Sequence, residues 1–271
     1  MTPAPDQDGG QNRGVITLFS VSDSTSKWSI ETSQALISVT HDSEGKHMAV
    51  GGNKGVVSIL NMDGNEIASP VGDSETDIYD VAYGHDGLLA CASDMSIKIW
   101  NVNSKQKIST LEGHSDIIKL ISFSPDYSIL ASGAHDNSIR FWDMSTYQET
   151  QSFENDARVE SVAYSPDGKH IASGAFNGMI KIWSVEDGSV VRTLAGHEEK
   201  VSKVSYSPDG YFLASISNDK TVRVWTLGST GAPDEVRIKS NHTQQVRALS
   251  VSSNMTIASG GWDGKINIFR F

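Results

Sequence analysis

The sequence predicts an all-β fold assembled from repeated small sheets. Three observations predict it: one phrase recurs along the chain, its spacing is nearly constant, and apolar residues alternate within each copy. The phrase reads FSPDYSILASGAHDNSIRFWDMS at 123–145, YSPDGKHIASGAFNGMIKIWSVE at 164–186 and YSPDGYFLASISNDKTVRVWTLG at 206–228. Self-similarity at a fixed period identifies a repeat architecture before any local pattern does.

The period is set by the large apolar residue that ends the third apolar run of each copy. These anchor residues follow one another at intervals of 40 to 44 residues along the chain. They are Phe19, Leu60, Trp100, Trp142, Trp183, Trp225 and Phe269. Seven anchors in register indicate that one supersecondary unit is repeated along the chain.

Within a copy, apolar and polar residues alternate, which is typical of β-strands. In SIRFW, Ile139 and Phe141 fall on one side of the chain, and Ser138, Arg140 and Trp142 on the other. The SPD and SPDG stretches predict tight turns, because Pro presets one turn angle and Asp or Gly suits the next positions. Each copy therefore predicts three strands up to its anchor. QKISTLEGH and SVVRTLAGH supply a fourth strand, and no segment predicts a helix.

The expected architecture is a β-propeller. A four-stranded sheet of about 40 residues cannot bury both faces alone, and radial face-to-face packing of such sheets solves this problem. We expect one propeller domain over 14–271, after a disordered polar tail at 1–13. Complete sets of first to third strands predict six blades, which begin near residues 35, 77, 117, 158, 200 and 245. The strand ending at Phe19 adds an N-terminal partial blade, so the blade number is six or seven.

Two copies resemble the WD-repeat β-propeller family. They read TLEGHSDIIKLISFSPDYSILASGAHDNSIRFWD at 110–143 and TLAGHEEKVSKVSYSPDGYFLASISNDKTVRVWT at 193–226. The shared features are Gly-His, a Ser-Pro-Asp turn, an Asp in the second turn and a terminal Trp. The likeness covers 14–271 and is weaker before 76. In this family the N-terminus usually supplies the outer strand of the last blade, and the candidates here are 15–20 and 26–31.

The resemblance implies a buried hydrogen-bonded chain of His, Ser, Asp and Trp inside a blade. Buried polar groups without partners cost free energy, so such a chain must be complete to be favourable. Two copies carry all four residues, namely His114, Ser132, Asp136 and Trp142, and His197, Ser215, Asp219 and Trp225.

Other copies depart from this pattern and are expected to depend more on packing. The copy at 157–185 has Asn155 at the His offset and Asn177 at the Asp offset. The last copy keeps His242, Ser259 and Asp263, but its anchor Phe269 has no N–H to donate. The copies at 35–62 and 76–102 lack the His.

No motif predicts catalysis, a metal site or a cofactor. The sequence contains no His-x-x-x-His or Cys-x-x-Cys pair, no Gly-rich phosphate loop and no Gly-x-Ser-x-Gly. NMDGNE at 61–66 lacks the Glu at the twelfth position of a calcium loop. The Asp residues of the Ser-Pro-Asp turns, Asp126, Asp167 and Asp209, are interpreted as turn residues. We therefore expect no enzyme activity and no catalytic, cofactor-binding or metal-binding residues.

Composition points to an intracellular protein of the cytoplasm, the nucleus or both. The single cysteine, Cys91, fits a reducing compartment. No apolar run is long enough to span a membrane, and the N-terminus does not read as a secretory signal. The net charge of −11 argues against non-specific coating of nucleic acid.

The resemblance implies a non-catalytic interaction scaffold, a single propeller within a hetero-complex that binds proteins or peptides, including acidic ones. The partner is expected on the face that carries the loops entering each first strand and the turns between second and third strands. Phe176 and Trp262 stand out there, because aromatic residues and Arg dominate interface hot spots. The predicted residues are Tyr79, Lys119, His135, Arg158, Glu160, Phe176, Lys200, Asn218, Gln245, Arg247 and Trp262.

Two other function classes stay open from the sequence. A nucleic-acid or phosphoinositide binder needs a basic patch, and Lys119, Arg158, Lys200 and Arg247 could share one face. Glu160, Glu198 and Glu199 lie beside them in the sequence and weaken this interpretation. An enzyme using the central channel needs converging titratable residues, and no pattern predicts them.

Overall fold

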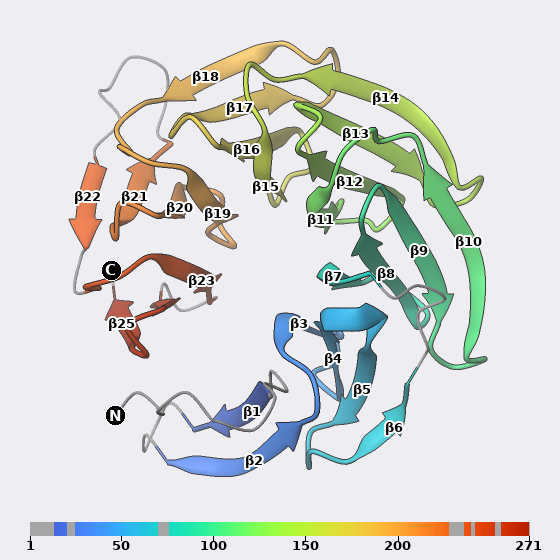
Figure 1. Ribbon diagram of the computed structural model, residues 1–271. Coiled ribbons are helices and arrows are strands. Elements are labelled where there is room, and N and C mark those ends of the chain that lie inside the picture. The colour runs from blue at the N-terminus through green and yellow to red at the C-terminus, as the bar shows by residue number, and fades with distance from the viewer. Residues whose placement is uncertain are drawn as a thin grey trace. The chain divides into compact units, whose positions relative to one another are not determined.

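The computed structural model describes residues 14–20, 25–69, 76–227, 236–239, 242–252 and 256–270. Among these residues the strands form seven sheets, and the only helix is one 3-10 turn at Asn53–Gly55 (Figure 1). Six of the sheets each contain the first, second and third strands of one sequence repeat. This is the all-β propeller fold with a partial N-terminal blade that the period predicted. The expected tail at 1–13 lies outside the described residues.

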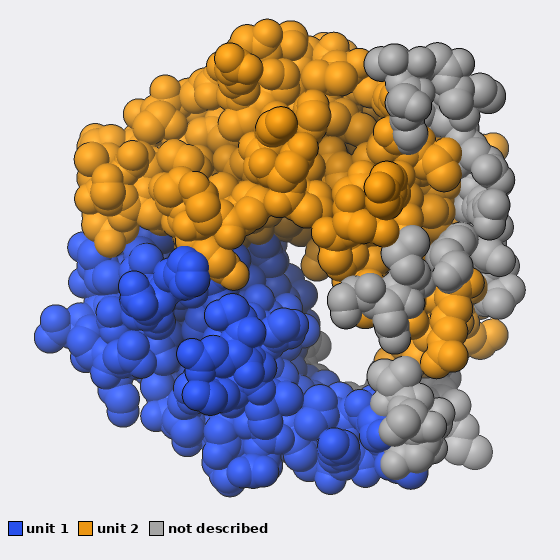
Figure 2. All heavy atoms as spheres, turned by 180° about the vertical axis from the view of Figure 1, so that it is seen from behind, with its two compact units in different colours: residues 1–110 blue, residues 111–271 orange. Residues whose placement is uncertain are grey.

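The chain divides into two compact units, 1–110 and 111–271, which Figure 2 colours blue and orange. The first unit holds a two-stranded sheet and two four-stranded sheets. Their strands are β1 (Gly14–Phe19) and β2 (Ser26–Thr32); β3 (Leu36–His41), β4 (His47–Gly52), β5 (Val57–Asn61) and β6 (Glu66–Ala68); and β7 (Ile78–Tyr83), β8 (Leu88–Ser93), β9 (Ser96–Asn101) and β10 (Gln106–Glu112), which crosses the boundary between the units.

The N-terminal partial blade consists of two strands rather than one. β1 pairs antiparallel with β2, with Ile16 opposite Ile30 and Leu18 opposite Trp28. Apolar side chains of this pair pack against the β3–β6 sheet around Val50. The Trp28 indole also donates a hydrogen bond of 2.8 Å to the Met62 carbonyl. The two segments expected as alternative closing strands are therefore partners in one sheet.

The second unit holds three four-stranded sheets and one sheet of three described strands. Within it, the first strands β11, β15, β19 and β23 lie side by side, and β14 and β18 lie on the outside (Figure 1). The strands are β11 (Ile118–Phe123), β12 (Ile129–Ala134), β13 (Ser138–Asp143) and β14 (Gln148–Glu154); β15 (Val159–Tyr164), β16 (His170–Ala175), β17 (Ile180–Ser184) and β18 (Val190–Leu194); β19 (Val201–Tyr206), β20 (Phe212–Ser217), β21 (Val222–Thr226) and β22 (Val236–Lys239); and β23 (Val246–Val251), β24 (Thr256–Gly261) and β25 (Ile266–Arg270).

The core of the second unit lies between consecutive sheets. Ile139 and Phe141 of β13 pack with Val159 and Val162 of β15, and the next junction repeats this arrangement. Close approach depends on a glycine in the second strand. A Cβ added at Gly133 would lie 2.6 Å from Val159 Cγ1, far inside ordinary contact distance. The glycine of the ASGA stretch in β12 and in β16 therefore lets each of these two sheets pack closely on the next.

Candidate partner-binding face and its supporting hydrogen bonds

A continuous chain of hydrogen bonds runs through the β11–β14 sheet. The Trp142 indole donates to the Ser132 hydroxyl over 2.9 Å. Ser132 Oγ lies 2.7 Å from His114 Nε2, and His114 Nδ1 lies 2.8 Å from Asp136 Oδ2. His114, Ser132 and Trp142 are all buried. These contacts bring together the four residues that the family resemblance implied for this blade.

The protonation states give this chain one direction. Burial lowers the pKa of His114, so its ring is neutral at pH 7. Burial alone would raise the pKa of Asp136, but hydrogen bonds from the Ser115 amide, the Ser138 hydroxyl and His114 outweigh it and lower the pKa. Asp136 is therefore ionised and only accepts. Nδ1 of His114 carries the proton, and Nε2 accepts from Ser132.

The other sheets of the second unit carry all or part of this chain. In β19–β22, Trp225 donates to Ser215 over 2.8 Å, and His197 lies 2.7 Å from Ser215 and 2.8 Å from Asp219. In β15–β18, Trp183 still donates to Ser173 over 2.8 Å. The departures from the pattern lie at Asn155, Asn177 and Phe269, and the last sheet retains His242, Ser259 and Asp263.

Each departure from the pattern has its own arrangement. The Asn155 amide donates to the Ala157 carbonyl over 2.8 Å, and the Asn177 side chain accepts from the Met179 amide. His242 lies 2.9 Å from Ser259 and 3.1 Å from Asp263, so only the Trp end of that chain is missing. The two incomplete blades therefore keep opposite halves of the chain.

The two groups of predicted partner-binding residues meet through backbone hydrogen bonds. In four successive sheets of the second unit, the amide of the turn residue between second and third strands donates to the carbonyl of a residue just before the first strand. The pairs are His135 with Ile117 at 2.9 Å, Phe176 with Arg158 at 2.9 Å, Asn218 with Lys200 at 3.1 Å, and Trp262 with Gln245 at 3.0 Å. These turns and strand entries, 117–119, 135, 158–160, 176, 200, 218, 245–247 and 262, are called the loop face below.

The most exposed aromatic of the loop face is Trp262, which is 63% exposed. The guanidinium carbon of Arg247 lies 4.4 Å from the centre of its indole ring, which is a cation–π contact. Arg247 Nη2 also donates to Gln245 Oε1 over 2.8 Å. Arg247 and Trp262 thus form a stacked pair held against the β23–β25 sheet.

Phe176 and Arg158 place a second exposed aromatic residue and a second arginine on the loop face, joined by the backbone hydrogen bond given above. The Phe176 side chain is 53% exposed, although it sits in a tight turn where the fold does not require an aromatic ring. Arg158 is exposed, and it has no carboxylate partner among the described residues. The loop face therefore offers exposed aromatic surface and two guanidinium groups that have no carboxylate partner among the described residues.

Glu160 corrects one prediction: it was expected on the partner-binding face, which requires an exposed side chain, and it is only 5% exposed. Its carboxylate lies 3.0 Å from His135 Nε2 and 3.0 Å from Lys200 Nζ. Burial alone would raise the pKa of Glu160, but these two hydrogen bonds outweigh it and lower the pKa to about 2. Glu160 joins three consecutive sheets instead of presenting its charge to a partner.

The remaining predicted residues are half-buried. Asn218 Oδ1 accepts a hydrogen bond of 3.1 Å from the Ser202 hydroxyl. Lys119 is half-buried at the start of β11 and has an interaction of its own. Tyr79 belongs to the first unit, where burial raises the pKa of its phenol. Because Lys200 is paired with Glu160, the four cations considered for a basic patch do not form one uninterrupted cationic surface.

Within the described ranges, no three His, Cys, Asp or Glu side chains cluster closely enough to hold a metal ion. A membrane-spanning helix needs more length and apolar character than any helix in the described residues has.

Comparison with known proteins identifies repeats along most of the chain. The family model described as "WD domain, G-beta repeat" matches residues 64–101, 105–143, 147–184, 188–226 and 234–270, which is more than half of the chain. Those five segments include the anchors from Trp100 to Phe269.

Several curated proteins are similar over shorter stretches. Nuclear distribution protein nudF of Aspergillus flavus is 40% identical over 74 residues, which cover 26% of this chain and 16% of nudF. Eukaryotic translation initiation factor 3 subunit I of Schizosaccharomyces pombe is 31% identical over 90 residues, 32% of this chain and 27% of that protein. Protein groucho of Drosophila melanogaster is 27% identical over 128 residues, 44% of this chain and 17% of groucho. The chain therefore matches at most 27% of the length of any of these three relatives.

Proposed function

Because the chain belongs to the WD-repeat family, we propose that it is a non-catalytic scaffold, a subunit of an intracellular multiprotein complex that binds peptides or folded proteins on its loop face. The observation that carries this proposal is the exposed Trp262 ring with Arg247 stacked on it. Trp and Arg are the residue types most enriched among interface hot spots. The name of the S. pombe relative, a translation initiation factor subunit, supports a role within an assembly.

The chemistry of the loop face favours an acidic peptide or a C-terminal carboxylate. Arg158 and Arg247 have no carboxylate partner among the described residues, and a guanidinium can hold a carboxylate with two parallel hydrogen bonds. Phe176 and Trp262 supply apolar contact area, which contributes most of the binding free energy, while the charges contribute orientation and association rate. A nucleic-acid or phosphoinositide ligand is less favoured, because Glu160 neutralises Lys200 within the same surface.

A finer proposal concerns the assembly. The stretches SDMSIKIWNVNSKQKIST at 93–110 and SVAYSPDGKHIASGAFNGMIKIW at 161–183 resemble the small WD-repeat subunit shared by the superkiller and Paf complexes. Because of that likeness, the other subunits of a superkiller-like or Paf-like complex are candidate partners. The affinity capture that tests the loop face also tests this proposal.

The test uses affinity capture with matched variants. The parent protein, Trp262→Ala, Arg247→Glu and the control Arg270→Glu serve as baits, after a check that all four melt at the same temperature. Arg270 is exposed at the other end of β25, so its variant changes the charge by the same amount away from Trp262. We expect the partners captured by the parent to be retained by Arg270→Glu and reduced at least about tenfold by the other two. If both loop-face variants retain every partner, the interaction lies elsewhere on the molecule.

A further inference from the structure

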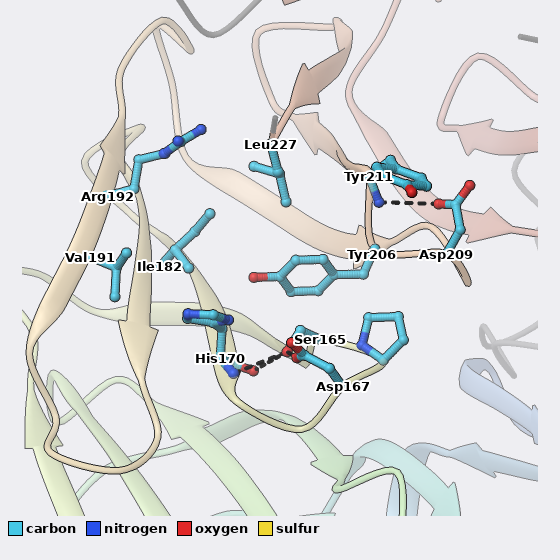
Figure 3. A pocket seen from close by; sticks show the side chains of 12 residues that line it. Ser165, Asp167, His170, Ile182, Val191, Arg192, Tyr206, Asp209, Tyr211 and Leu227 are labelled. Carbon is cyan, nitrogen blue, oxygen red and sulfur yellow. Dashed lines mark hydrogen bonds between the residues drawn. The ribbon is translucent and has the colours of Figure 1, made fainter. Parts of the chain in front are cut away.

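The second unit contains a hollow of about 620 Å³ between the β15–β18 and β19–β22 sheets. It lies beside the Ser-Pro-Asp-Gly turns at 165–168 and 207–210, whereas the loop face lies at the other end of the second strands. Figure 3 shows His170, Ile182 and Val191 on one side and Tyr211 and Leu227 on the other, with the ring of Tyr206 between them. The volume falls in the range of small-ligand pockets.

The preceding junction of the same unit explains why the hollow exists. There, Phe141 occupies the position of Ile182, because each precedes the Trp anchor of its third strand. Tyr164 is the counterpart of Tyr206. The centre of the Phe141 ring lies 6.3 Å from the centre of the Tyr164 ring and 4.7 Å from that of Phe153. In the sheet beside the hollow, Ile182 and Leu194 take the register positions of Phe141 and Phe153, and Ile182 lines the hollow. The smaller Ile182 side chain therefore leaves space that the Phe141 ring fills at the preceding junction.

Two polar groups in the hollow have no side-chain hydrogen-bond partner among the described residues. Tyr206 is 9% exposed, and its hydroxyl oxygen is buried and forms no hydrogen bond with the described residues. Figure 3 shows this hydroxyl pointing toward Ile182 and His170. The His170 ring likewise has no hydrogen-bond partner among the described side chains. A buried hydroxyl without a partner costs free energy, and a ligand that offers an acceptor would recover it.

The rim of the hollow is more apolar than the matching rim one sheet earlier. Val190 and Val191 of β18 are 44% and 54% exposed, and their register positions on β14 hold Glu149 and Thr150. Tyr211 is 72% exposed and takes the position of Lys169 in the repeat. This apolar strip continues beyond the hollow, so it suits an extended peptide segment better than a compact small molecule.

Charge at the mouth limits which peptide fits. Asp167 and Asp209 are exposed at the two turns, and both are ionised at neutral pH because hydrogen bonds, first of all from Ser165 and Ser207, lower their pKa values. The whole chain also carries a net charge of −11. Arg192 also lines the hollow, so two carboxylates and one guanidinium leave the lining net negative. Lys or Arg beside the inserted aromatic residue is therefore favoured over Asp or Glu.

From these observations we propose that the hollow is a second binding site, which takes a neutral or basic peptide segment of a partner protein. The segment inserts one aromatic side chain where the Phe141 ring would lie and places a backbone carbonyl as acceptor for the Tyr206 hydroxyl. Its flanking residues cover Tyr211 and Val191. This site is separate from the loop face and recognises the opposite charge.

The experiment uses the full chain with methyl-labelled Ile, Leu and Val and three synthetic peptides. The probe is acetyl-Ser-Lys-Gly-Phe-Gly-Lys-Ser-amide; one control replaces Phe by Ala, and another replaces both Lys by Glu. We expect the probe to cause saturable NMR shifts at the methyl groups of Ile182, Val191 and Leu227. Each control peptide should bind at least about fivefold more weakly, which corresponds to about 1 kcal/mol.

Two variants copy residues that the chain already uses at the preceding junction. Ile182→Phe fills the hollow with the side chain found at Phe141, and we expect it to abolish binding. Tyr211→Lys removes the exposed ring without touching the core, and we expect about fivefold weaker binding. No saturable shift at these methyl groups, unchanged binding by both variants, or equal affinity for the Lys and Glu peptides would overturn the proposal.

Discussion

At the scale of single residues, the Trp142 indole begins a chain in which every donor has one acceptor. Trp142 donates to Ser132, Ser132 to His114, and His114 to Asp136. We expect Trp142→Phe to destabilise the protein by about 1–3 kcal/mol, since it removes a buried hydrogen bond and leaves Ser132 without its donor. Chemical denaturation followed by far-UV circular dichroism measures this change.

Phe269→Trp is the matched comparison for that variant. The β23–β25 sheet already has His242, Ser259 and Asp263 in place without an indole donor. Its folded state therefore tolerates an absent donor, and the added N–H should change the free energy of unfolding by less than Trp142→Phe does. Equal or reversed shifts of the denaturation midpoint would contradict the account of the polar chain.

The ionised carboxylate of Glu160 makes the stability of the folded protein depend on pH. Its pKa is about 2 in the folded protein, below the ordinary value of 4.5, so folding favours the ionised form. The stabilisation is fully present above pH 4.5 and is lost as the pH falls from 4.5 toward 2. We expect Glu160→Gln to be less stable by roughly 1–2 kcal/mol at pH 6, with a smaller difference at pH 3.5. A difference that stays constant with pH would show that the charge of Glu160 does not contribute.

The burial of Glu160 also shows where reasoning from the sequence stops. Alternation within ARVESVAY places Glu160 beside the first apolar residue of a strand, which predicts exposure at a loop. Its burial depends on His135 and Lys200, which are 25 and 40 positions away in other repeats. The sequence shows that His135 and Lys200 can pair with a carboxylate. It does not show which carboxylate, because that depends on how three sheets pack together.

At the scale of strands and sheets, the second-strand glycines set the distance between neighbouring sheets. A Cβ at Gly174 would lie 2.7 Å from Val201 Cγ1 and 3.2 Å from Val204 Cγ1. We expect Gly174→Ala to destabilise the protein by about 1–3 kcal/mol through overpacking, despite the better strand propensity of alanine. Differential scanning calorimetry measures the loss.

A double variant tests the cause of that loss. Val201→Ala removes the atom that the new Cβ would meet, so Gly174→Ala should cost less in a Val201→Ala background than in the parent. Additive losses would mean that the cost arises from the backbone of β16 and not from the junction. In β20 the same repeat position holds Ile216, so the chain itself changes this spacing residue where its neighbours allow it.

Strand positions were predictable because the same pattern of turns and anchor residues recurs in several copies along the chain. Ser-Pro-Asp turns mark the ends of first strands, and the Trp anchors mark the ends of third strands, as β11 to β21 confirm. The pairing of β1 with β2 was not predicted. Neither segment carries a Ser-Pro-Asp turn, and only Phe19 is in register with the period. The hollow beside Tyr206 escaped prediction for a related reason, since the exchange of Phe141 for Ile182 keeps the apolar pattern and changes only volume.

At the scale of the whole chain, the sequence period and the division into two compact units raise a question of cooperativity. The boundary at residues 110 and 111 falls within β10, and the period continues across it from Trp100 to Trp142. Repeat proteins derive their stability from each repeat and its neighbour, so a strand that belongs to both units connects their unfolding. The sequence predicts a single domain over 14–271, and a single domain requires that the two units unfold together.

We expect the two units to unfold in one transition. Leu111 is 1% exposed at the end of β10, so the second unit cannot unfold around Leu111 without releasing part of a strand that the first unit uses. The measurement is hydrogen exchange with mass spectrometry along a denaturant series, which follows peptides from β8 in the first unit and β20 in the second. Both peptides should lose protection at the same denaturant concentration, and a Leu111→Ala variant should lower both midpoints together. Separate midpoints in the parent protein, or a shift confined to one unit in the variant, would mean that residues 14–271 fold as two domains.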